Sequence, residues 1–195
     1  MAAQRLVLAS ASPRRLELLR QVGLDPDRVL APDVDETPRT GELPRQLAER
    51  LARAKLDDIA HQEADAFVVA ADTVVACGRR VLDKTEEPIR ARQLLELLSG
   101  RRHRVLTGVA ARAPDGRIAE RVALTQVKFK RLEPHDIDRY LASEEWRGKA
   151  GAYAIQGRAE GFVVAINGSW SNVVGLPLEL TLRLLRGLGF AESER

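Results

Sequence analysis

Hydrophobic and polar positions near the start of the chain alternate in the pattern of a mixed α/β protein. Residues 5–9, Arg-Leu-Val-Leu-Ala, predict a short buried strand. Leucines at helical spacing then predict a helix through residues 16–22, which Gly23 ends. Residues 24–42 contain three prolines and should form a polar loop with at most a short strand. A long amphipathic helix should follow over residues 44–61.

The middle of the chain predicts a second buried strand. Residues 67–71, Phe-Val-Val-Ala-Ala, are an apolar run that ends on Asp72 and Thr73. A small hairpin around Gly78 and a helix over residues 88–98 should come next.

A long hairpin is predicted around the Asp-Gly pair at residues 115–116, so residues 103–113 and 117–131 should form antiparallel strands. In the second strand the apolar residues fall first on even and then on odd positions. Because strand side chains alternate between two faces, this change requires a bulge or burial of both faces. We therefore expect an irregularity near residues 125–126.

The C-terminal part predicts a helix over residues 134–143, strands over 153–156 and 162–166, a turn at 167–168, and a last helix over 177–188. No linker, repeat or low-complexity tract interrupts the pattern, so we expect a single domain over residues 1–195. The predicted fold class is α/β, with a mixed, largely antiparallel central sheet flanked by helices.

Composition narrows the function classes. The chain has 195 residues, with 31 Lys and Arg against 28 Asp and Glu, and 45% of its residues are hydrophobic. No apolar run approaches the roughly 20 residues that span a bilayer, so we expect no membrane partner. Aromatic residues make up only 4% of the chain, which argues against a stacking platform for single-stranded nucleic acid. A single cysteine, Cys77, fits a reducing compartment, and we expect a cytoplasmic protein.

The segment Ser10-Ala-Ser-Pro-Arg-Arg15 is the first candidate site. If Ser12 is the N-cap of the first helix, Arg14 and Arg15 occupy positions where the helix dipole favours acidic residues. An anion bound by both guanidinium groups and the free N–H groups would explain this placement. The alternative is a pair of solvated arginines.

Carboxylates supply the second candidate site. Asp72 and Thr73 follow a predicted strand, where ligand crevices of α/β sheets form, and Asp35 and Glu36 form an acidic pair in the first loop. Together with Asp72, the carboxylates of this acidic pair could hold a hard divalent cation through oxygen ligands. An ordinary strand-end Asp and a solvated acidic pair are the alternatives. Neither a P-loop nor a dinucleotide-binding fingerprint is present.

In chain order, these residues resemble the Maf family of nucleoside triphosphate pyrophosphatases. The resemblance rests on Ser10-Ala-Ser-Pro-Arg-Arg15, Asp35-Glu36, Ala71-Asp-Thr-Val-Val75, Leu82-Asp-Lys84, Leu98-Ser-Gly100 with His103, Thr107-Gly108, Lys149-Ala-Gly-Ala-Tyr-Ala-Ile-Gln-Gly157 and Asn172-Val-Val-Gly-Leu-Pro177. It implies an elongated fold similar to the inosine triphosphatase type, a cytoplasmic location, homodimers, a divalent metal (Mg²⁺, Mn²⁺ or Co²⁺) and a link to division arrest. The implied reaction converts a nucleoside triphosphate to a monophosphate and pyrophosphate. Many members have Gly-Lys-Pro where this chain has Asp83-Lys84-Thr85.

Within the family, Arg14, Thr73 and Gln156 resemble the branch that hydrolyses dTTP and UTP, and a sibling branch prefers 7-methyl-GTP. Uracil and thymine present an N–H donor beside carbonyl acceptors, and a Gln amide offers both complements. We therefore expect Gln156 to recognise the base.

The resemblance assigns the remaining roles. Asp72, Lys84 and Lys55 are expected to be catalytic, with Asp72 as general base, and Glu36 and Asp72 to hold the metal. Ser10, Ser12, Arg14, Arg15, Thr73 and Gln156 are expected to bind the substrate.

Three alternatives remain open. The chain could be a non-enzymatic division regulator that binds a protein or nucleic acid through basic stretches at 101–104 and 128–131. The lack of aromatics makes a nucleic-acid partner the weaker expectation. The second is a pyrophosphatase for 7-methyl-GTP, and the third is an enzyme that removes modified pyrimidine nucleotides.

Overall fold

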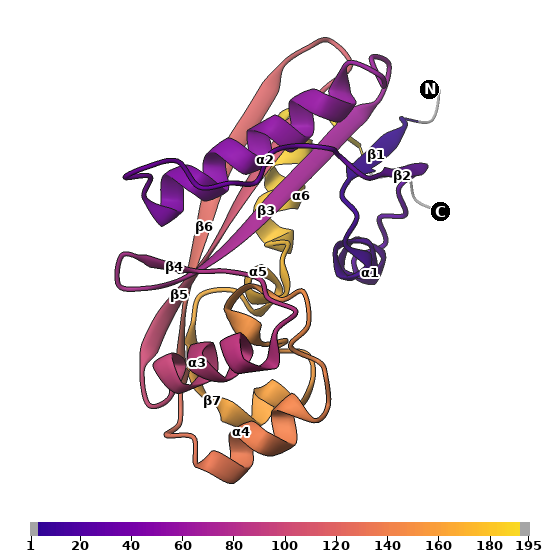
Figure 1. Cartoon of the computed structure of the whole chain (residues 1–195). Helices are drawn as coiled ribbons and strands as arrows, with labels where there is room; N and C mark the ends of the chain where they lie inside the picture. Colours follow the sequence, from indigo (N-terminus) through magenta and orange to yellow (C-terminus); the bar gives the residue numbers. More distant parts are fainter. Residues whose placement is uncertain (1–3, 192–195) are drawn as a thin grey trace.

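A seven-stranded mixed sheet runs along the long axis of the molecule, as Figure 1 shows. The computed structural model describes residues 4–191. The strands are β1 (Leu6–Ala9), β2 (Arg28–Leu30), β3 (Phe67–Cys77), β4 (Arg80–Leu82), β5 (Arg102–Arg112), β6 (Ile118–Phe129) and β7 (Val163–Asn167). Their order is β2-β1-β3-β5-β6-β7, with β4 paired to β3. Strand β1 is parallel to β2 and β3, and the other pairs are antiparallel, which confirms the predicted sheet.

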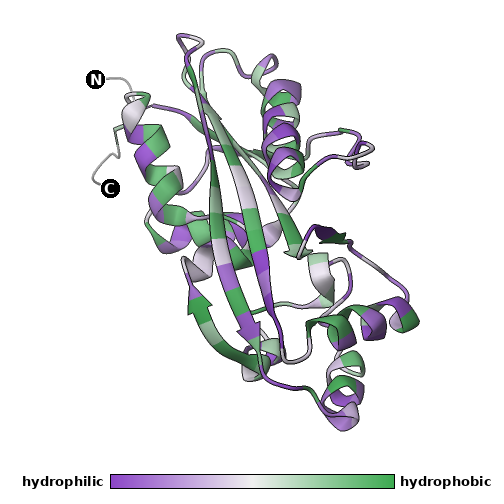
Figure 2. Cartoon of the chain, turned by 90° about the vertical axis from the view of Figure 1, so that its left-hand side faces the viewer, coloured by the Kyte–Doolittle hydropathy of each residue, from purple (hydrophilic) through white to green (hydrophobic). Residues whose placement is uncertain are grey.

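Helices cover both faces of this sheet. They are α1 (Pro13–Gln21), α2 (Pro44–Ala60), α3 (Pro88–Leu98), α4 (Pro134–Leu141), α5 (Trp170–Val174) and α6 (Leu178–Gly187), with 3₁₀ turns η1 (Ala150–Ala152) and η2 (Arg158–Phe162). Figure 2 shows the sheet between α2 on one side and α6 on the other. The predicted helices at 44–61, 88–98, 134–143 and 177–188 are all confirmed within a few residues.

Helix α2 packs on β3 and β5 because its apolar residues share one face. Leu47, Leu51 and Leu56 are buried against the sheet. The contact is closest at Gly108 of β5, where an added Cβ would lie 2.1 Å from the carbonyl oxygen of Ala48. Only glycine therefore lets α2 approach the sheet this closely.

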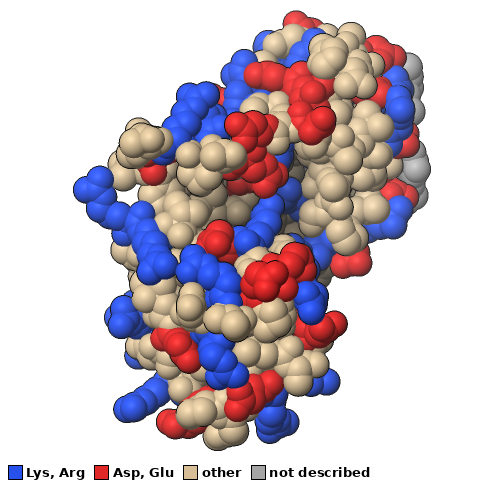
Figure 3. Space-filling model, viewed as in Figure 1, with Lys and Arg blue, Asp and Glu red and all other residues tan. Residues whose placement is uncertain are grey.

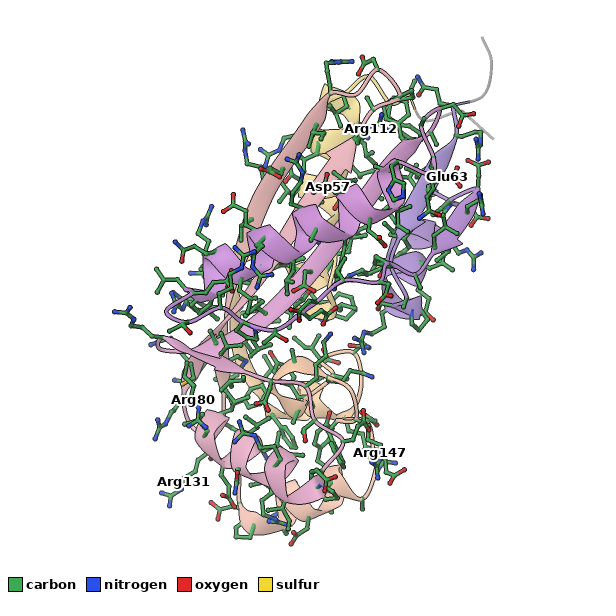
Figure 4. All side chains as sticks on the ribbon, turned by 45° about the horizontal axis from the view of Figure 1, so that its top comes forward. Asp57, Glu63, Arg80, Arg112, Arg131 and Arg147 are labelled. Atoms are coloured by element: carbon green, nitrogen blue, oxygen red, sulfur yellow. The ribbon has the colours of Figure 1, made fainter. Side chains whose placement is uncertain are left out.

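Salt bridges hold the N-terminal strands to the end of α2. Glu63 is 3% exposed and accepts hydrogen bonds from Arg5, at 3.0 Å, and from Arg28. The carboxylate of Asp27 accepts a 2.8 Å hydrogen bond from the backbone N–H of Leu6. Figure 4 labels Glu63 beside the first two strands. These contacts fix β1 and, through it, the start of α1.

Two strand predictions were wrong. Strand β3 does not end at Ala71 but continues to Cys77, because β5 pairs with it antiparallel from Val68 to Ala76. Asp72 and Thr73 are therefore in the middle of a strand, and it is the parallel neighbour β1 that ends beside Ala70. Residues 153–156 do not form a strand but follow η1 as an irregular turn.

The irregularity expected near residues 125–126 was also misplaced. The β5–β6 pairing is continuous through Thr125 and Gln126, and the register shift lies between Lys128 and Phe129, where β6 pairs with β7. The apolar residues change parity because β6 is covered on different faces along its length. Val122 packs on the side of α2, and Val127 and Phe129 pack in the main core on the other side.

Candidate active site

A cleft of about 300 Å³ opens between α1, β3, the segment around η1 and the C-terminal end of α5. Figure 3 shows Lys and Arg side chains in the recess between the two halves of the molecule, with acidic side chains at its edge. The cleft is lined by Ser12, Pro13, Arg14, Arg15, Lys55, Asp72, Thr73, Val75, Lys84, Gly148, Lys149, Ala150, Tyr153, Ala154, Ile155, Gln156, Val173, Val174 and Gly175. Five of these residues are cationic and one is acidic. The lining therefore favours a ligand with several negative charges.

Asp72 lies in this cleft beside Lys55. The carboxylate is only 4% exposed and accepts a 2.6 Å hydrogen bond from Lys55 Nζ, which is itself buried. Lys55 comes from α2 and Asp72 from β3, so the contact depends on the close packing at Gly108. In the sheet, Gly108 is the register partner of Asp72.

Glu36 extends this ion pair to the first loop. Its two carboxylate oxygens lie 2.5 Å from Lys55 Nζ and 2.9 Å from Lys84 Nζ. Burial alone would raise the pKa of Glu36, but hydrogen bonds from Lys55 and Lys84 and their charges outweigh it and lower the pKa to about 2. The structure thus joins Glu36, Lys55, Asp72 and Lys84 into one chain of alternating charge. Glu36 lies in an adjoining hollow with Asp72, Thr73 and Lys84 rather than in the cleft wall itself.

Arg15 is the structural member of the arginine pair. Its guanidinium donates hydrogen bonds to the carbonyl oxygen of Gly175 at 2.8 Å, to Ser10 Oγ at 3.1 Å and to Thr73 Oγ1 at 3.3 Å. Burial lowers the pKa of Arg15, and the charge of Asp72 opposes that shift. Ser10 is buried behind Arg15 and does not line the cleft. Arg15 therefore ties α1, β3 and α5 together at the cleft.

Arg14 lines the cleft and differs from Arg15 in its hydrogen bonding. Its Nε is enclosed by protein and has no hydrogen-bond partner within the described residues. Burial lowers the pKa of its guanidinium, and nearby Glu17 partly offsets this. A buried donor without a partner costs free energy unless a ligand or water supplies an acceptor. Ser12 is the N-cap of α1 as predicted, but its side chain makes no capping hydrogen bond.

Lys149 was missed by the sequence reasoning as a site residue. It lines the same cleft, and its Nζ donates to the carbonyl oxygen of Arg147 at 3.0 Å. Burial, followed by the charge of Arg14, lowers the pKa of Lys149. An anion between two cations that repel each other in this way would stabilise both. A lone lysine before Ala-Gly carries no local signal of this role, because only the fold brings it to Arg14.

Thr73 and Gln156 both line the cleft, but their side chains differ in hydrogen bonding. Thr73 Oγ1 lies 3.0 Å from Thr107 Oγ1 and donates to the carbonyl oxygen of Gly175 at 3.3 Å. Gln156 is exposed in the turn after η1 and lines the cleft wall. Its amide is therefore available to a ligand, whereas the Thr73 hydroxyl is engaged by the protein.

The carboxylates of Glu36 and Asp72 fit a metal ion that is also coordinated by the phosphates of a ligand. No group of three or more His, Cys, Asp or Glu side chains within residues 4–191 could hold a metal ion. Glu36 and Asp72 nevertheless place two carboxylates on either side of Lys55. Mg²⁺ is typically held by one or two carboxylates together with substrate phosphates. The donor set thus fits a metal–polyphosphate complex.

The basic stretches at 101–104 and 128–131 lie side by side, with Arg102 the register partner of Lys128, and the protein itself engages part of their side chains. His103 is 1% exposed, and Arg104 donates to the carbonyl oxygen of Gly78. Lys130 pairs with Asp136 at 3.1 Å. Figure 4 labels Arg80, Arg112, Arg131 and Arg147 at separate places on the molecule.

Fold and site together define an α/β protein with a cationic cleft built around one buried carboxylate. The family model described as "Maf-like protein" matches residues 5–188, and the chain belongs to this family. It is 58% identical over 192 residues to the dTTP/UTP pyrophosphatase of Maricaulis maris (strain MCS10), covering 98% of this chain and 91% of the relative. It is 59% identical over 186 residues to that of Paramagnetospirillum magneticum (strain ATCC 700264 / AMB-1), covering 95% and 98%.

Among solved structures, a HAM1 protein from Coxiella burnetii shares the fold. It has a TM-score of 0.51 at 16% identity and covers 94% of this chain and 99% of its own. No helix within residues 4–191 combines the length and apolar character needed to cross a membrane.

Proposed function

We propose that this protein is a nucleoside triphosphate pyrophosphatase, a hydrolase acting on acid anhydrides, that converts dTTP and UTP to the monophosphate and pyrophosphate. The observation that carries this proposal is the buried carboxylate of Asp72 in a cleft with five cationic side chains. A triphosphate carries the matching negative charge. The relatives named dTTP/UTP pyrophosphatase support the choice of substrate.

Asp72 acts as the general base. It takes a proton from a water molecule whose oxygen forms a bond to the α-phosphorus. The bond from the α-phosphorus to the oxygen bridging to the β-phosphorus breaks, and the electron pair leaves with pyrophosphate. Lys55 orients the carboxylate through its 2.6 Å hydrogen bond.

The cations stabilise the negative charge of the triphosphate and of the leaving pyrophosphate. Arg14 and Lys84 reach the phosphates directly, as does the hydroxyl of Ser12, and Lys55 adds its charge beside Asp72. Ser10 and Arg15 contribute by holding α1 against Thr73 and Gly175. Preorganised charges of this kind need no rearrangement when the leaving group departs.

Gln156 recognises the base, with Thr73 and Arg14 shaping the same side of the cleft. An amide offers a donor and an acceptor to the edge of uracil or thymine, whereas a carboxylate only accepts and suits the donors of guanine. This difference disfavours 7-methyl-GTP as the substrate.

A divalent cation, Mg²⁺, Mn²⁺ or Co²⁺, would be held by Glu36 and Asp72 together with phosphate oxygens, and when bound it withdraws charge from the phosphates. We further propose that residues 1–195 act as one domain, as a homodimer in the cytoplasm. Size-exclusion chromatography with light scattering tests the dimer. Modified pyrimidine triphosphates belong to the same substrate class, and their removal would protect nucleic acids from incorporation. A contribution to division arrest would follow from depleting such nucleotides.

The test is a panel of canonical and modified nucleoside triphosphates with Mg²⁺, Mn²⁺ or Co²⁺, in which pyrophosphate and phosphate are measured separately. Pyrophosphate from dTTP and UTP is expected. Preferred cleavage of 7-methyl-GTP would assign the sibling specificity. If no triphosphate is cleaved and duplex DNA binds with a steep salt dependence, the protein is a non-enzymatic regulator.

A further inference from the structure

A second recess opens from the cleft between α1 and α5. Its volume is about 280 Å³, and it shares three lining residues, Arg14, Gln156 and Val174, with the cleft. The others are Glu17, Leu18, Gln21 and Trp170. The two spaces differ in chemistry. The cleft holds Asp72 and most of the cations, and the recess holds two apolar side chains, two amides, an indole ring and one charge of each sign, from Arg14 and Glu17.

Trp170 stands out among the aromatic residues. Its side chain is 39% exposed, whereas every other aromatic side chain within residues 4–191 is buried. Trp146, the other tryptophan of the chain, is only 1% exposed. Exposure of an indole ring at a recess that leads to a functional cleft marks a binding surface, because covering it would remove apolar area from water.

The helix that carries Trp170 is held rigidly. Asn172, two residues after Trp170 in α5, is fully buried and donates to the carbonyl oxygen of Val105 at 3.1 Å and to Thr125 Oγ1 at 2.9 Å. Ser169, the N-cap, accepts from the backbone N–H of Asn172 and donates its own N–H to Thr125 Oγ1 at 3.0 Å. Although α5 has only five residues, these hydrogen bonds therefore hold Trp170 and Val174 in a fixed position relative to the sheet.

We propose that Trp170 forms the stacking wall of a pyrimidine-base subsite in the recess between α1 and α5. This assignment rests on the proposed function, since it places the base of the same triphosphate. Arg14 lies at the junction of the two spaces, where the phosphates end and the nucleoside begins. Gln156 contacts the hydrogen-bonding edge of the base, and the indole ring covers its face.

Trp170 and Gln156 contribute differently to the binding of the base, for a physical reason. When a ligand binds, an exposed amide such as Gln156 exchanges hydrogen bonds to water for hydrogen bonds to the ligand, so these bonds add little affinity by themselves. Stacking on an aromatic ring removes apolar surface from water and is tolerant of which base is bound. Trp170 thus supplies affinity for the nucleoside, and Gln156 supplies the choice of base.

Steady-state kinetics of Trp170→Ala and Trp170→Phe test this directly. Trp170→Ala is expected to lower kcat/KM for dTTP and UTP by about 5- to 100-fold, chiefly by raising KM. Trp170→Phe keeps a ring and should retain most of the wild-type value. Inhibition by tripolyphosphate, which has no base, should be equal in all three proteins. Ile89→Ala, which removes an exposed side chain from α3, is the control and should change nothing.

Fluorescence supplies a readout that does not need turnover. Titration with α,β-methylene-UTP and Mg²⁺ should quench the wild-type emission, and tripolyphosphate should not. The remaining Trp146 emission of Trp170→Phe should not respond. Far-UV circular dichroism establishes that each variant is folded.

Three results would overturn the inference. One is a Trp170→Ala enzyme with unchanged KM, and another is a Trp170→Phe enzyme as impaired as Trp170→Ala, which would assign the role to the indole N–H. The third is equal weakening of tripolyphosphate and nucleotide. If the wild type cleaves no triphosphate, the proposed function fails, and the fluorescence titration still decides whether a base reaches Trp170.

Discussion

Lys55 donates a 2.6 Å hydrogen bond to Asp72 across the contact between α2 and β3, and both side chains are buried. Removing one partner of such a pair leaves the other charge buried without compensation. The pair therefore couples the packing of α2 on the sheet to the orientation of the proposed general base.

Asp72→Asn should lower kcat for dTTP by about 10²- to 10⁴-fold, because the amide cannot take a proton from water. The shape of the side chain is kept, and Lys55 can still donate to the amide oxygen, so the fold should be unchanged by circular dichroism. Asp57→Asn is a matched control, since Asp57 is exposed on α2, where it forms an ion pair with Arg53 one turn away. A kcat equal to that of the wild type in Asp72→Asn would remove Asp72 from the reaction.

Gly108→Ala should destabilise the protein by about 1–3 kcal/mol in urea unfolding, because its Cβ meets the Ala48 carbonyl oxygen at 2.1 Å. The displaced α2 carries Lys55, so kcat should fall as well. Gly187→Ala is the control, since a Cβ there meets nothing within 4 Å. Equal stability of Gly108→Ala and the wild type would show that the α2 contact is not tight.

Gln156→Glu should lower kcat/KM for dTTP and UTP by about 10- to 100-fold, because the carboxylate has no donor for the base. Gln93→Glu on α3 adds the same charge, but Gln93 lines neither the cleft nor the recess, so this variant is the control and should have little effect. The measurement is relative kcat/KM across a panel of triphosphates. An unchanged ranking of substrates would exclude Gln156 from base recognition.

His103 predicts a pH dependence of stability. Burial lowers the pKa of its imidazole to about 4 from the ordinary value of 6.5, and its Nδ1 has no hydrogen-bond partner within the described residues. The unfolded chain takes up this proton below about pH 6.5 and the folded chain only below about pH 4. Stability is therefore lost as pH falls through this window, by about 3 kcal/mol when complete.

His103→Gln removes the titration and keeps a partner for the Tyr153 hydroxyl, which lies 2.8 Å from His103 Nε2. Urea unfolding at pH 7 and at pH 4 should show a smaller loss in this variant than in the wild type. Equal losses would mean that His103 does not contribute.

Local patterns were enough to predict much of the fold. The Asp-Gly pair fixed the long hairpin, and the apolar face of α2 was visible in the spacing of its leucines. The length of β3 was not predictable, because the polar pair Asp72 and Thr73 resembles a strand end until the distant strand β5 pairs with it. Helix α5 has five residues and depends on the long-range contacts of Asn172.

The candidate site was predictable where a local motif carried it. Arg14 and Arg15 are anomalous at a helix start, and the structure distinguishes them, because Arg15 donates to the Gly175 carbonyl oxygen whereas Arg14 Nε has no hydrogen-bond partner within the described residues. Lys149 lines the cleft and Trp170 lines the adjoining recess only because of the tertiary fold. Lys149 begins one of the segments that carry the family resemblance, but neither residue could be assigned a role from its own position in the sequence. Glu36 and Lys55 join Asp72 from separate elements, which the family resemblance indicated and spacing alone did not.

Hydrolysis of dTTP in ¹⁸O-labelled water tests the central claim most directly, because it identifies the phosphorus that is attacked. The account predicts pyrophosphate as the released product, with the label in dTMP and none in pyrophosphate. Release of single phosphate, or label in pyrophosphate instead of dTMP, would contradict attack at the α-phosphorus.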